Sequence, residues 1–279
     1  MRKLPLALLF ALSVPILLHA QGVGQGRTTY QGAELTFLDV GQGDAILIRS
    51  DTFVVLIDAG RNQLAVDDLR RLGVDHVNLL VASHNHFDHI GGMDAIIRAL
   101  PVALFIDNGC QESSEAQAYV EDAMRERHLG SRAAWDTTFT LGPATLRILP
   151  SPFYTPACDS SQNNLSVGAI LRVGHFSALL TGDSEKYEEI AWVNAGLIPD
   201  VDVLKAAHHG ADNGVTPGWI ATANPEVVVI SVGTNTYGHP CPGALGYYQT
   251  HGRRVLRTDR DGTVTVRVDS SGAYQVQPQ

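Results

Sequence analysis

Three histidines and one aspartate lie within six residues of this chain, in the order His-x-His-x-Asp-His, from His84 to His89. An apolar run at 77–81 precedes them and a pair of glycines follows, which predicts the end of a buried strand and the start of a helix. Imidazoles and carboxylates suit zinc and other divalent first-row metals. His84 and His86 share one face of an extended run, whereas Asp88 and His89 fall where the chain turns. Four donors facing two directions can serve two ions, and this context favours a metal site over a surface histidine cluster.

Strand-like and helix-like runs alternate in two successive halves of the chain. The first half has strands at 34–38, 45–49, 53–57, 77–81 and 102–106, with helices at 65–72, 93–100 and 114–127. The second has strands at 138–141, 145–149, 167–173, 177–180, 201–205, 227–231, 255–257, 264–268 and 274–277, with helices at 185–194, 217–223 and 243–251. Two such halves without a linker between them predict one α/β domain of two packed sheets with outer helices.

Six further short motifs follow one another along the chain. They are FLDVGQGDA at 37–45, LIDAG at 56–60, NNLSV at 163–167, TGD at 181–183, LKAAHHG at 204–210 and YGHP at 237–240. With the histidine motif they resemble the metallo-β-lactamase fold superfamily, and within it the extracellular hydrolase domain of ComEC-type DNA-uptake proteins. The resemblance runs from about residue 34 to 267. It implies an αββα four-layer sandwich of two mixed β-sheets flanked by helices.

Two later motifs offer the remaining metal donors. Asp183 follows an apolar strand and a Thr-Gly pair, so its carboxylate can reach the sheet edge where the first motif ends, although such an Asp is commonly a turn or cap residue. The resemblance implies that it bridges two metals. The adjacent His208 and His209 project differently. One would complete a metal set with Asp88 and His89 while the other faces substrate, and His208 is nominally placed first as the ligand.

An asparagine pair stands where many metallo-β-lactamase-like enzymes present another histidine. Asn163 and Asn164 offer carbonyl oxygens, which are harder ligands than imidazole. One ion would then be held by His84, His86 and Asp183, with water or an asparagine completing the set. Capping of a strand entry is an equal alternative for the pair. The expected cofactors are two divalent ions, Zn²⁺ or Mn²⁺, and the oxygen-rich ligation favours manganese relative to zinc.

Several polar residues near the expected site could orient the metal ligands, hold the attacking water or contact the substrate. Asp58 and Asp44 can orient the imidazoles from behind, although both can equally be turn residues. Asp88 can hold the attacking water as well as ligate metal. His239, with Tyr237, is a candidate substrate contact, the alternative being an ordinary loop histidine. The expected catalytic set is Asp88, His208, His209 and His239.

The N-terminal residues resemble an export signal. Arg2 and Lys3 precede an apolar stretch at 4–18 that ends before Ala20, so residues 1–20 are expected to be a signal peptide, with an uncleaved anchor as the alternative. Residues 21–32 then form a flexible lead, and 33–279 the hydrolase domain. The mature chain would be secreted or periplasmic, with no transmembrane segment after cleavage.

Charge and cysteine content narrow the partners and the compartment. The formal net charge is −9, and removal of Arg2 and Lys3 makes it −11, which weakens the case for a general nucleic-acid binder but leaves metal-assisted chemistry on nucleic acids open. Cys110 and Cys158 lie in polar loop sequence and could pair in an oxidising compartment, the alternative being isolated thiols.

These features lead to one main functional hypothesis and its competitors. We expect a secreted dinuclear metal-dependent hydrolase, a phosphodiesterase or nuclease acting through metal-activated water on nucleic acid or a cell-surface phosphodiester. Lactone or β-lactam hydrolysis is possible on the same metal pair. A non-catalytic, metal-containing module that binds DNA or envelope polymer is the alternative from a different class. The substrate is expected to be a small-molecule or polymer phosphodiester, with DNA as one candidate and the oligomeric state left open.

Overall fold

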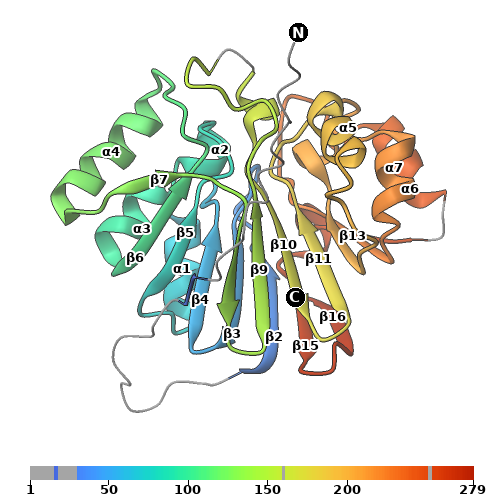
Figure 1. Cartoon of the computed structure of the whole chain (residues 1–279), viewed down its shortest axis with the longest axis horizontal. Helices are drawn as coiled ribbons and strands as arrows, with labels where there is room; N and C mark the ends of the chain where they lie inside the picture. Colours follow the sequence, from blue (N-terminus) through green and yellow to red (C-terminus); the bar gives the residue numbers. More distant parts are fainter. Residues whose placement is uncertain (1–15, 18–29, 159–160, 251–252) are drawn as a thin grey trace, which may run out of the picture.

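The computed structural model describes residues 16–17, 30–158, 161–250 and 253–279, which form two sheets with helices outside them (Figure 1). One sheet has the strand order β16-β15-β2-β3-β4-β5-β6-β7 and the other β1-β8-β9-β10-β11-β12-β13-β14. Both combine parallel and antiparallel neighbours. The expected αββα sandwich of two mixed sheets is confirmed.

The first sheet takes its strands from both ends of the chain. They are β2 (Tyr30–Phe37), β3 (Ile46–Asp51), β4 (Phe53–Ile57), β5 (Val77–Val81), β6 (Val102–Asp107), β7 (Ser131–Ala133), β15 (Val264–Asp269) and β16 (Tyr274–Pro278). Its helices are α1 (Leu64–Arg71), α2 (Phe87–Ile90), α3 (Met93–Ala99) and α4 (Glu115–Arg127). The last two strands therefore come from the C-terminal end of the sequence, where β15 pairs with β2 and β16 pairs with β15.

The second sheet is built from the middle and later parts of the chain. Its strands are β1 (Ile16–Leu17), β8 (Thr137–Leu141), β9 (Ala144–Leu149), β10 (Gly168–Val173), β11 (Phe176–Leu180), β12 (Val203–Lys205), β13 (Val227–Ile230) and β14 (Arg254–Arg257). The helices of this half are α5 (Lys186–Asn194), α6 (Pro217–Ala223), α7 (Pro242–Gln249) and α8 (Thr258–Asp261), with 3₁₀ turns at η1 (Gln162–Leu165) and η2 (Ala207–Gly210).

Three apolar clusters explain the four layers. The largest lies between the sheets and combines residues such as Phe37, Leu79, Phe139 and Leu171. A second lies between the first sheet and α1, α3 and α4, and a third between the second sheet and α5, α6 and α7. In Figure 1 these two sets of helices flank the paired sheets on opposite sides. Strands such as β5 are buried along their whole length because both faces of their sheet are covered.

Local signals set several helix ends. The Ser114 hydroxyl accepts a hydrogen bond from Gln117 N at 3.2 Å and begins α4, which ends at His128 in the left-handed region (φ 54°). Thr216 begins α6 in the same way, followed by a proline at the first helical position. Among the described residues, no helix has the length and apolarity required to cross a membrane. The expected signal at 1–20 and lead at 21–32 lie outside the described residues, except for β1 and residues 30–32.

Candidate metal centre

The candidate donors gather where strands of both sheets end. His84, His86, Asp88 and His89 lie in the turn after β5 and in the short helix α2. Asp183 follows β11, and η2, which carries His208 and His209, follows β12. Because these strand ends meet along the seam between the sheets, residues about one hundred positions apart come into contact.

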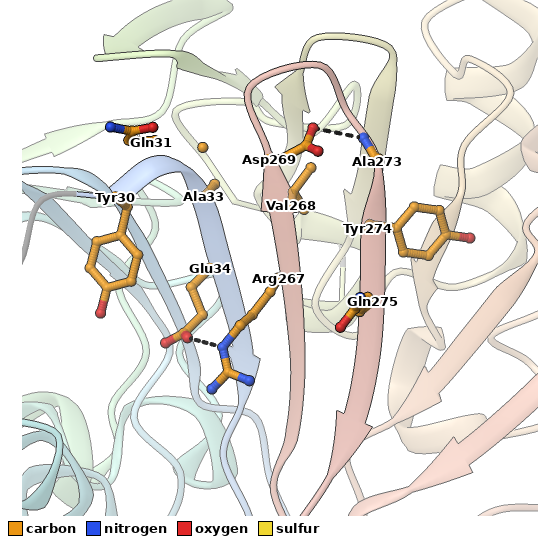
Figure 2. A pocket seen from close by; sticks show the side chains of 11 residues that line it. Tyr30, Gln31, Ala33, Glu34, Arg267, Val268, Asp269, Ala273, Tyr274 and Gln275 are labelled. Carbon is orange, nitrogen blue, oxygen red and sulfur yellow. Dashed lines mark hydrogen bonds and ion pairs between the residues drawn. The ribbon is translucent and has the colours of Figure 1, made fainter.

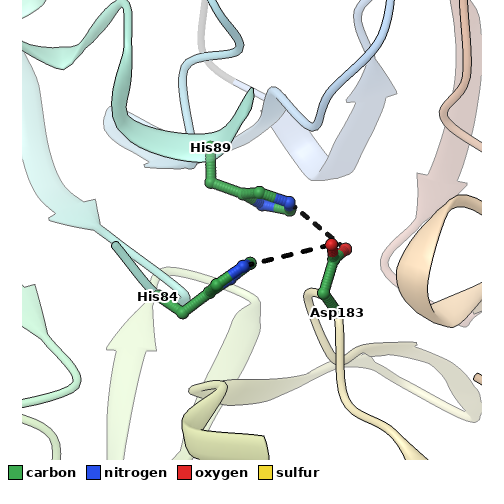
Figure 3. Close-up of side chains that lie close together, drawn as sticks. All are labelled: His84, His89 and Asp183. Atoms are coloured by element: carbon green, nitrogen blue, oxygen red, sulfur yellow. Dashed lines mark ion pairs between the residues drawn. The ribbon is translucent and has the colours of Figure 1, made fainter. Parts of the chain in front are cut away.

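His84, His89 and Asp183 form one compact donor group (Figure 3). The Nε2 atom of His89 lies 3.2 Å from Oδ1 of Asp183, and Nε2 of His84 lies 4.0 Å from Oδ2. All three side chains are buried. The ring of His86 approaches this group, with its Nδ1 2.9 Å from Nε2 of His84.

A second donor group shares one member with the first. Asp88, His89 and His209 offer ligand atoms that lie within 4.8 Å of one another. The Nε2 atom of His209 is 3.4 Å from Oδ2 of Asp88 and also 3.4 Å from Oδ2 of Asp183. The two oxygens of Asp183 therefore face different sides, since Oδ1 faces His89 while Oδ2 faces His84 and His209.

Unpartnered polar atoms at the centre of these groups fit a bound cation. His89 Nε2, His209 Nε2 and Asp183 Oδ1 are buried and lie at the ion-pair distances given above, but none of them makes a well-aligned hydrogen bond to another described residue. Leaving such atoms unpaired costs about 1–3 kcal/mol each, so native proteins rarely do so without a ligand. Two imidazoles and a carboxylate are donors that zinc and manganese accept. The residues present therefore fit divalent metal.

Contacts behind the imidazoles aim their Nε2 atoms at the centre. Nδ1 of His89 lies 2.8 Å from Oδ2 of Asp58, and that carboxylate also accepts hydrogen bonds from N and Oγ of Ser83. Nδ1 of His209 lies 2.8 Å from the carbonyl oxygen of Ser231. Such contacts fix the ring orientation and the tautomer of a ligand histidine. Asp58 thus lies in the supporting position that the sequence indicates.

Asp44 and Lys205 form a buried ion pair beside the donors. The Lys205 ammonium pairs with Asp44, donates to the carbonyl of Gly182 at 2.8 Å and lies 3.7 Å from Oδ1 of Asp183. Lys205 is completely buried. Asp44 also lies 3.4 Å from Nδ1 of His209, so it contacts a donor histidine from behind.

His208 and His209 are separated by an unusual backbone. Both adopt left-handed conformations, with φ of 49° and 54°, which cost non-glycine residues about 1–2 kcal/mol each. His208 is turned toward Asn213, whose Oδ1 lies 3.0 Å from its Nδ1, and its Nε2 is 3.8 Å from Oδ2 of Asp183. The structure groups His209, rather than the nominal first choice His208, with Asp88 and His89.

The two asparagines are held by one carboxylate. Glu185 accepts a hydrogen bond from Nδ2 of Asn163 through one oxygen and from Nδ2 of Asn164 through the other, each at 2.9 Å. The Oδ1 atoms of the two asparagines are buried and lack a hydrogen-bond partner among the described residues. Asn163 Nδ2 also approaches His208 Nε2 at 3.4 Å, so this pair borders the donor groups.

The protonation of the donors follows from their charges. Burial, reinforced by the charge of His89, holds the pKa of His84 well below its ordinary value. Burial would also lower the pKa of His89 and His209, but the surrounding carboxylates together raise both pKa values well above the ordinary range: Asp183 and Asp58 act on His89, and Asp183, Asp44 and Asp88 on His209. Burial would raise the pKa of Asp88, but His209 and His89 lower it. A metal ion therefore competes with protons for these donors.

An open pocket of about 310 Å³ gives access to the centre. Asp88, Asp183 and His209 line its base, and His239 and Tyr237 line it from the loop after β13. The ring centroid of His239 is 5.2 Å from that of His208, so this histidine lies beside the donors rather than among them.

Another hollow lies on the first sheet, away from the donors. It has a volume of about 430 Å³ and borders β2, β15 and β16 (Figure 2). Its charged residues have partners, since Nε of Arg267 donates to Oε2 of Glu34 at 2.9 Å and Asp269 accepts a hydrogen bond from Ala273 N. The described residues of this hollow offer no histidine or cysteine, so it is not the candidate centre.

A disulfide supports the loops around the centre. Cys110 and Cys158 are bonded, which confirms the pairing considered from the sequence, and Cys241 is free. The bond joins the loop after β6 to the segment that precedes η1. The carbonyl of Cys110 accepts a hydrogen bond from Nδ2 of Asn85 at 2.6 Å, and Asn85 lies between His84 and His86. The disulfide therefore connects the histidine motif with the asparagine segment.

Comparison with known proteins identifies the family. Residues 38–233 match the metallo-beta-lactamase superfamily. The chain belongs to that superfamily. It is 27% identical over 269 residues to ComE operon protein 3 of Bacillus subtilis and 29% identical over 249 residues to competence protein ComA of Neisseria gonorrhoeae. These alignments cover 88% and 86% of the chain but 34% and 33% of the relatives, so the chain spans about a third of their length. The resemblance to ComEC-type proteins is confirmed.

A solved structure agrees with the fold. Igni18, a metallo hydrolase from the archaeon Ignicoccus hospitalis, superposes with a TM-score of 0.54 at 19% identity, covering 83% of this chain and 98% of its own. Membership of the superfamily supports a metal-dependent hydrolase fold.

Sequence reasoning missed Lys205 within this metallo-beta-lactamase centre. Its signal was present, because a lysine stands in an otherwise apolar run just before the His208-His209 pair. Charged residues are almost never fully buried unless paired, so a lysine in a buried strand indicates a nearby carboxylate. Glu185 was missed as well, since an acidic residue at a helix start is ordinarily explained by the helix dipole.

Proposed function

We propose that this chain is an exported, dinuclear metal-dependent phosphodiesterase that cleaves nucleic acid or another phosphodiester. The observation that carries the proposal is the convergence of two donor groups, His84, His89 and Asp183 with Asp88, His89 and His209, beside one open pocket, which Asp88, Asp183 and His209 line. In metal-bound protein we assign His84, His86 and Asp183 to one ion and Asp88, His89, His209 and Asp183 to the other. Zn²⁺ and Mn²⁺ are the candidate ions.

Bound divalent ions supply Lewis acidity and lower the pKa of water. The chain's own residues supply orientation. Asp88 is partly exposed in the pocket and can accept a hydrogen bond from the attacking water. His208 and His239 lie beside the donors and can donate to a phosphate oxygen or to the leaving group. Asp58 and Ser231 keep the two ligand imidazoles in place.

Two observations support export and a phosphodiester substrate. The disulfide between Cys110 and Cys158 is typical of oxidising compartments, in agreement with the basic and apolar start of the sequence. One relative is named as a competence protein, and we take this name as support for DNA as a candidate substrate. The acidic balance of the chain makes the metal centre the expected source of affinity for an anionic substrate.

Metal analysis together with a substrate panel tests this proposal. The chain loaded with Zn²⁺ or Mn²⁺ should hold about two ions and hydrolyse bis(p-nitrophenyl) phosphate in preference to a lactone or a cephalosporin. His209→Ala should abolish turnover, whereas His175→Ala, in the exposed turn between β10 and β11, should not. A loaded chain that cleaves only the lactone or the cephalosporin contradicts the phosphodiester assignment. A loaded chain that cleaves nothing supports the non-catalytic module.

A further inference from the structure

Two large aromatic rings at the mouth of the metal pocket are exposed to solvent. Phe87 is 53% exposed although it lies between His86 and Asp88, and Tyr237 is 61% exposed. Both line the pocket that leads to Asp88 and His209. Single exposed apolar side chains are common, but two rings from separate elements beside one reactive centre indicate a surface for a planar ligand.

Arg61 adds a positive charge to the same pocket mouth. Its guanidinium carbon lies 5.7 Å from the centre of the Phe87 ring, and its buried Nε has no hydrogen-bond partner among the described residues. No carboxylate of the described part of the chain pairs with it, in contrast to Arg147 and Arg257, which pair with Asp136 and Asp259. In a chain with an excess of acidic groups, an unpaired arginine in a pocket is available for an anion.

The backbone before Arg61 is shaped to hold this position. Gly60 has φ of 65°, and a Cβ atom there would come within 2.7 Å of Cγ2 of Val40. The chain therefore turns sharply directly after Asp58, which supports His89 from behind. Only three peptide bonds therefore separate Arg61 from Asp58, which contacts the donor His89.

We propose that Arg61, Phe87 and Tyr237 form a nucleotide subsite next to the scissile phosphate. In this subsite the rings stack on an unpaired base, and Arg61 pairs with the neighbouring, non-reacting phosphate. The inference rests on the proposed phosphodiesterase function and chooses between its two substrate classes, because a polyol phosphate has no planar ring to stack. A base held inside a duplex has both faces occupied, so the subsite selects single-stranded nucleic acid.

Three esters with the same p-nitrophenolate leaving group isolate each contact. They are ethyl p-nitrophenyl phosphate, thymidine 3′-(p-nitrophenyl phosphate), and the latter compound with a 5′-phosphate. Stacking predicts that kcat/KM rises about tenfold from the first ester to the second, and an anion contact predicts a comparable rise from the second to the third. Activity on the ethyl ester tests the proposed function. The ratios of kcat/KM between successive esters test the subsite.

Single-residue variants show which side chain causes each rise in kcat/KM. Phe87→Ala or Tyr237→Ala should reduce the thymidine-to-ethyl ratio, chiefly through KM, and Phe87→Tyr should restore it. Arg61→Met should reduce only the rise caused by the 5′-phosphate. Tyr119→Ala on α4 and Arg172→Met on β10, which do not line the pocket, are matched controls for which both ratios should persist. Equal losses on all three esters would show that the variants only disturb the metal donors, and would overturn the subsite.

Binding without turnover gives an independent measurement. Thymidine 3′,5′-bisphosphate should bind the metal-loaded chain in calorimetry, and Tyr237→Ala or Arg61→Met should each weaken it about tenfold. Equal affinity for ribitol 1,5-bisphosphate, which carries two phosphates without a ring, would overturn the stacking part. This result stands whether or not the esters are hydrolysed, so failure of the subsite and failure of the phosphodiesterase proposal are distinguishable.

Discussion

The ammonium group of Lys205 lies between two carboxylates, pairing with Asp44 and standing 3.7 Å from Oδ1 of Asp183, with no part of the lysine exposed. Lys205 belongs to the second sheet, whereas Asp44 precedes β3 of the first. The pair therefore crosses the seam that holds the metal donors. It also neutralises part of a strongly acidic cluster that contains Asp58 as well.

Removal of the lysine charge should destabilise the fold through the carboxylate left behind. We predict that Lys205→Met lowers the free energy of unfolding by about 3–5 kcal/mol, because the buried Asp44 carboxylate loses its ammonium partner. Urea unfolding monitored by circular dichroism measures the change. The double variant Lys205→Met with Asp44→Asn should recover most of the loss. No recovery would mean that Lys205 acts through packing instead.

The adjacent histidines should differ in their effect on metal content. His209→Ala should reduce bound metal by about one ion per chain, since its Nε2 faces both Asp88 and Asp183. His208→Ala should keep the metal and lower kcat. Elemental analysis of dialysed protein separates the two, with His175→Ala as the matched control. Equal metal loss in both variants would contradict the assignment.

The carboxylate of Asp88 should matter more for turnover than for substrate affinity. Asp88→Asn keeps the shape but removes the charge, so kcat on a cleaved phosphodiester should fall about 10²-fold or more with a smaller change in KM. The far-ultraviolet spectrum should not change, because Asp88 lies on a short helix at the sheet edge. Asp136→Asn, in a surface ion pair, is the control. Unchanged kcat would place the activity elsewhere.

A buried glutamate away from the metal donors should give the fold a pH dependence. Burial raises the pKa of Glu189 well above its ordinary value, with Lys186 opposing the shift, and its oxygens have no hydrogen-bond partner among the described residues. Because the pKa of Glu189 is higher in the folded chain than in the unfolded chain, its contribution to stability is complete below the unfolded pKa near 4.5. This contribution is lost as the pH rises through the folded pKa.

Glu189→Gln should therefore stabilise the chain at pH 8 and leave it almost unchanged at pH 4. The wild type is expected to lose up to about 1.4 kcal/mol per pH unit in that interval from this group. Urea unfolding across this pH range measures the difference. Glu115→Gln, at the exposed start of α4, is the matched control. Parallel pH profiles for Glu189→Gln and the wild type would contradict the prediction.

The disulfide should contribute to stability through the loop that it closes. Cys110 and Cys158 are separated by 48 residues, for which the loss of chain entropy in the unfolded state predicts about 4 kcal/mol. Cys110→Ser with Cys158→Ser should lose this amount, and dithiothreitol should bring the wild type to the same value. Cys241→Ser should retain the response to reductant. A double variant as stable as the wild type would contradict the prediction.

Local signals predicted the parts of this molecule that depend on nearby residues. The donor motif from His84 to His89 was recognisable because its strand, turn and helix are contiguous, and the alternation of strands and helices sufficed for the two-sheet fold. The partner of Lys205 was not predictable, because Asp44 lies in the loop before a strand of the other sheet, about 160 residues earlier. The same is true of β15, whose pairing with β2 is a long-range contact without a local signature.

The separate directions of His208 and His209 were not predictable for a different reason. A strand ending predicts alternating side-chain directions, but two successive left-handed residues rotate both rings away from that pattern. Left-handed conformations are rare outside glycine and cannot be inferred from the adjacent residue types. Such strain concentrates at functional sites, where the surrounding structure maintains it.

The division of the donors between two sheets has a consequence for the whole chain. His84 and His89 are anchored in one layer and Asp183 and His209 in the other, so an ion held by both layers fastens them together. The free energy of metal binding and the free energy that holds the two layers together are then linked, so a change in one changes the other. A substitution in the inter-layer core, at Phe139 for example, should alter metal retention without touching a ligand.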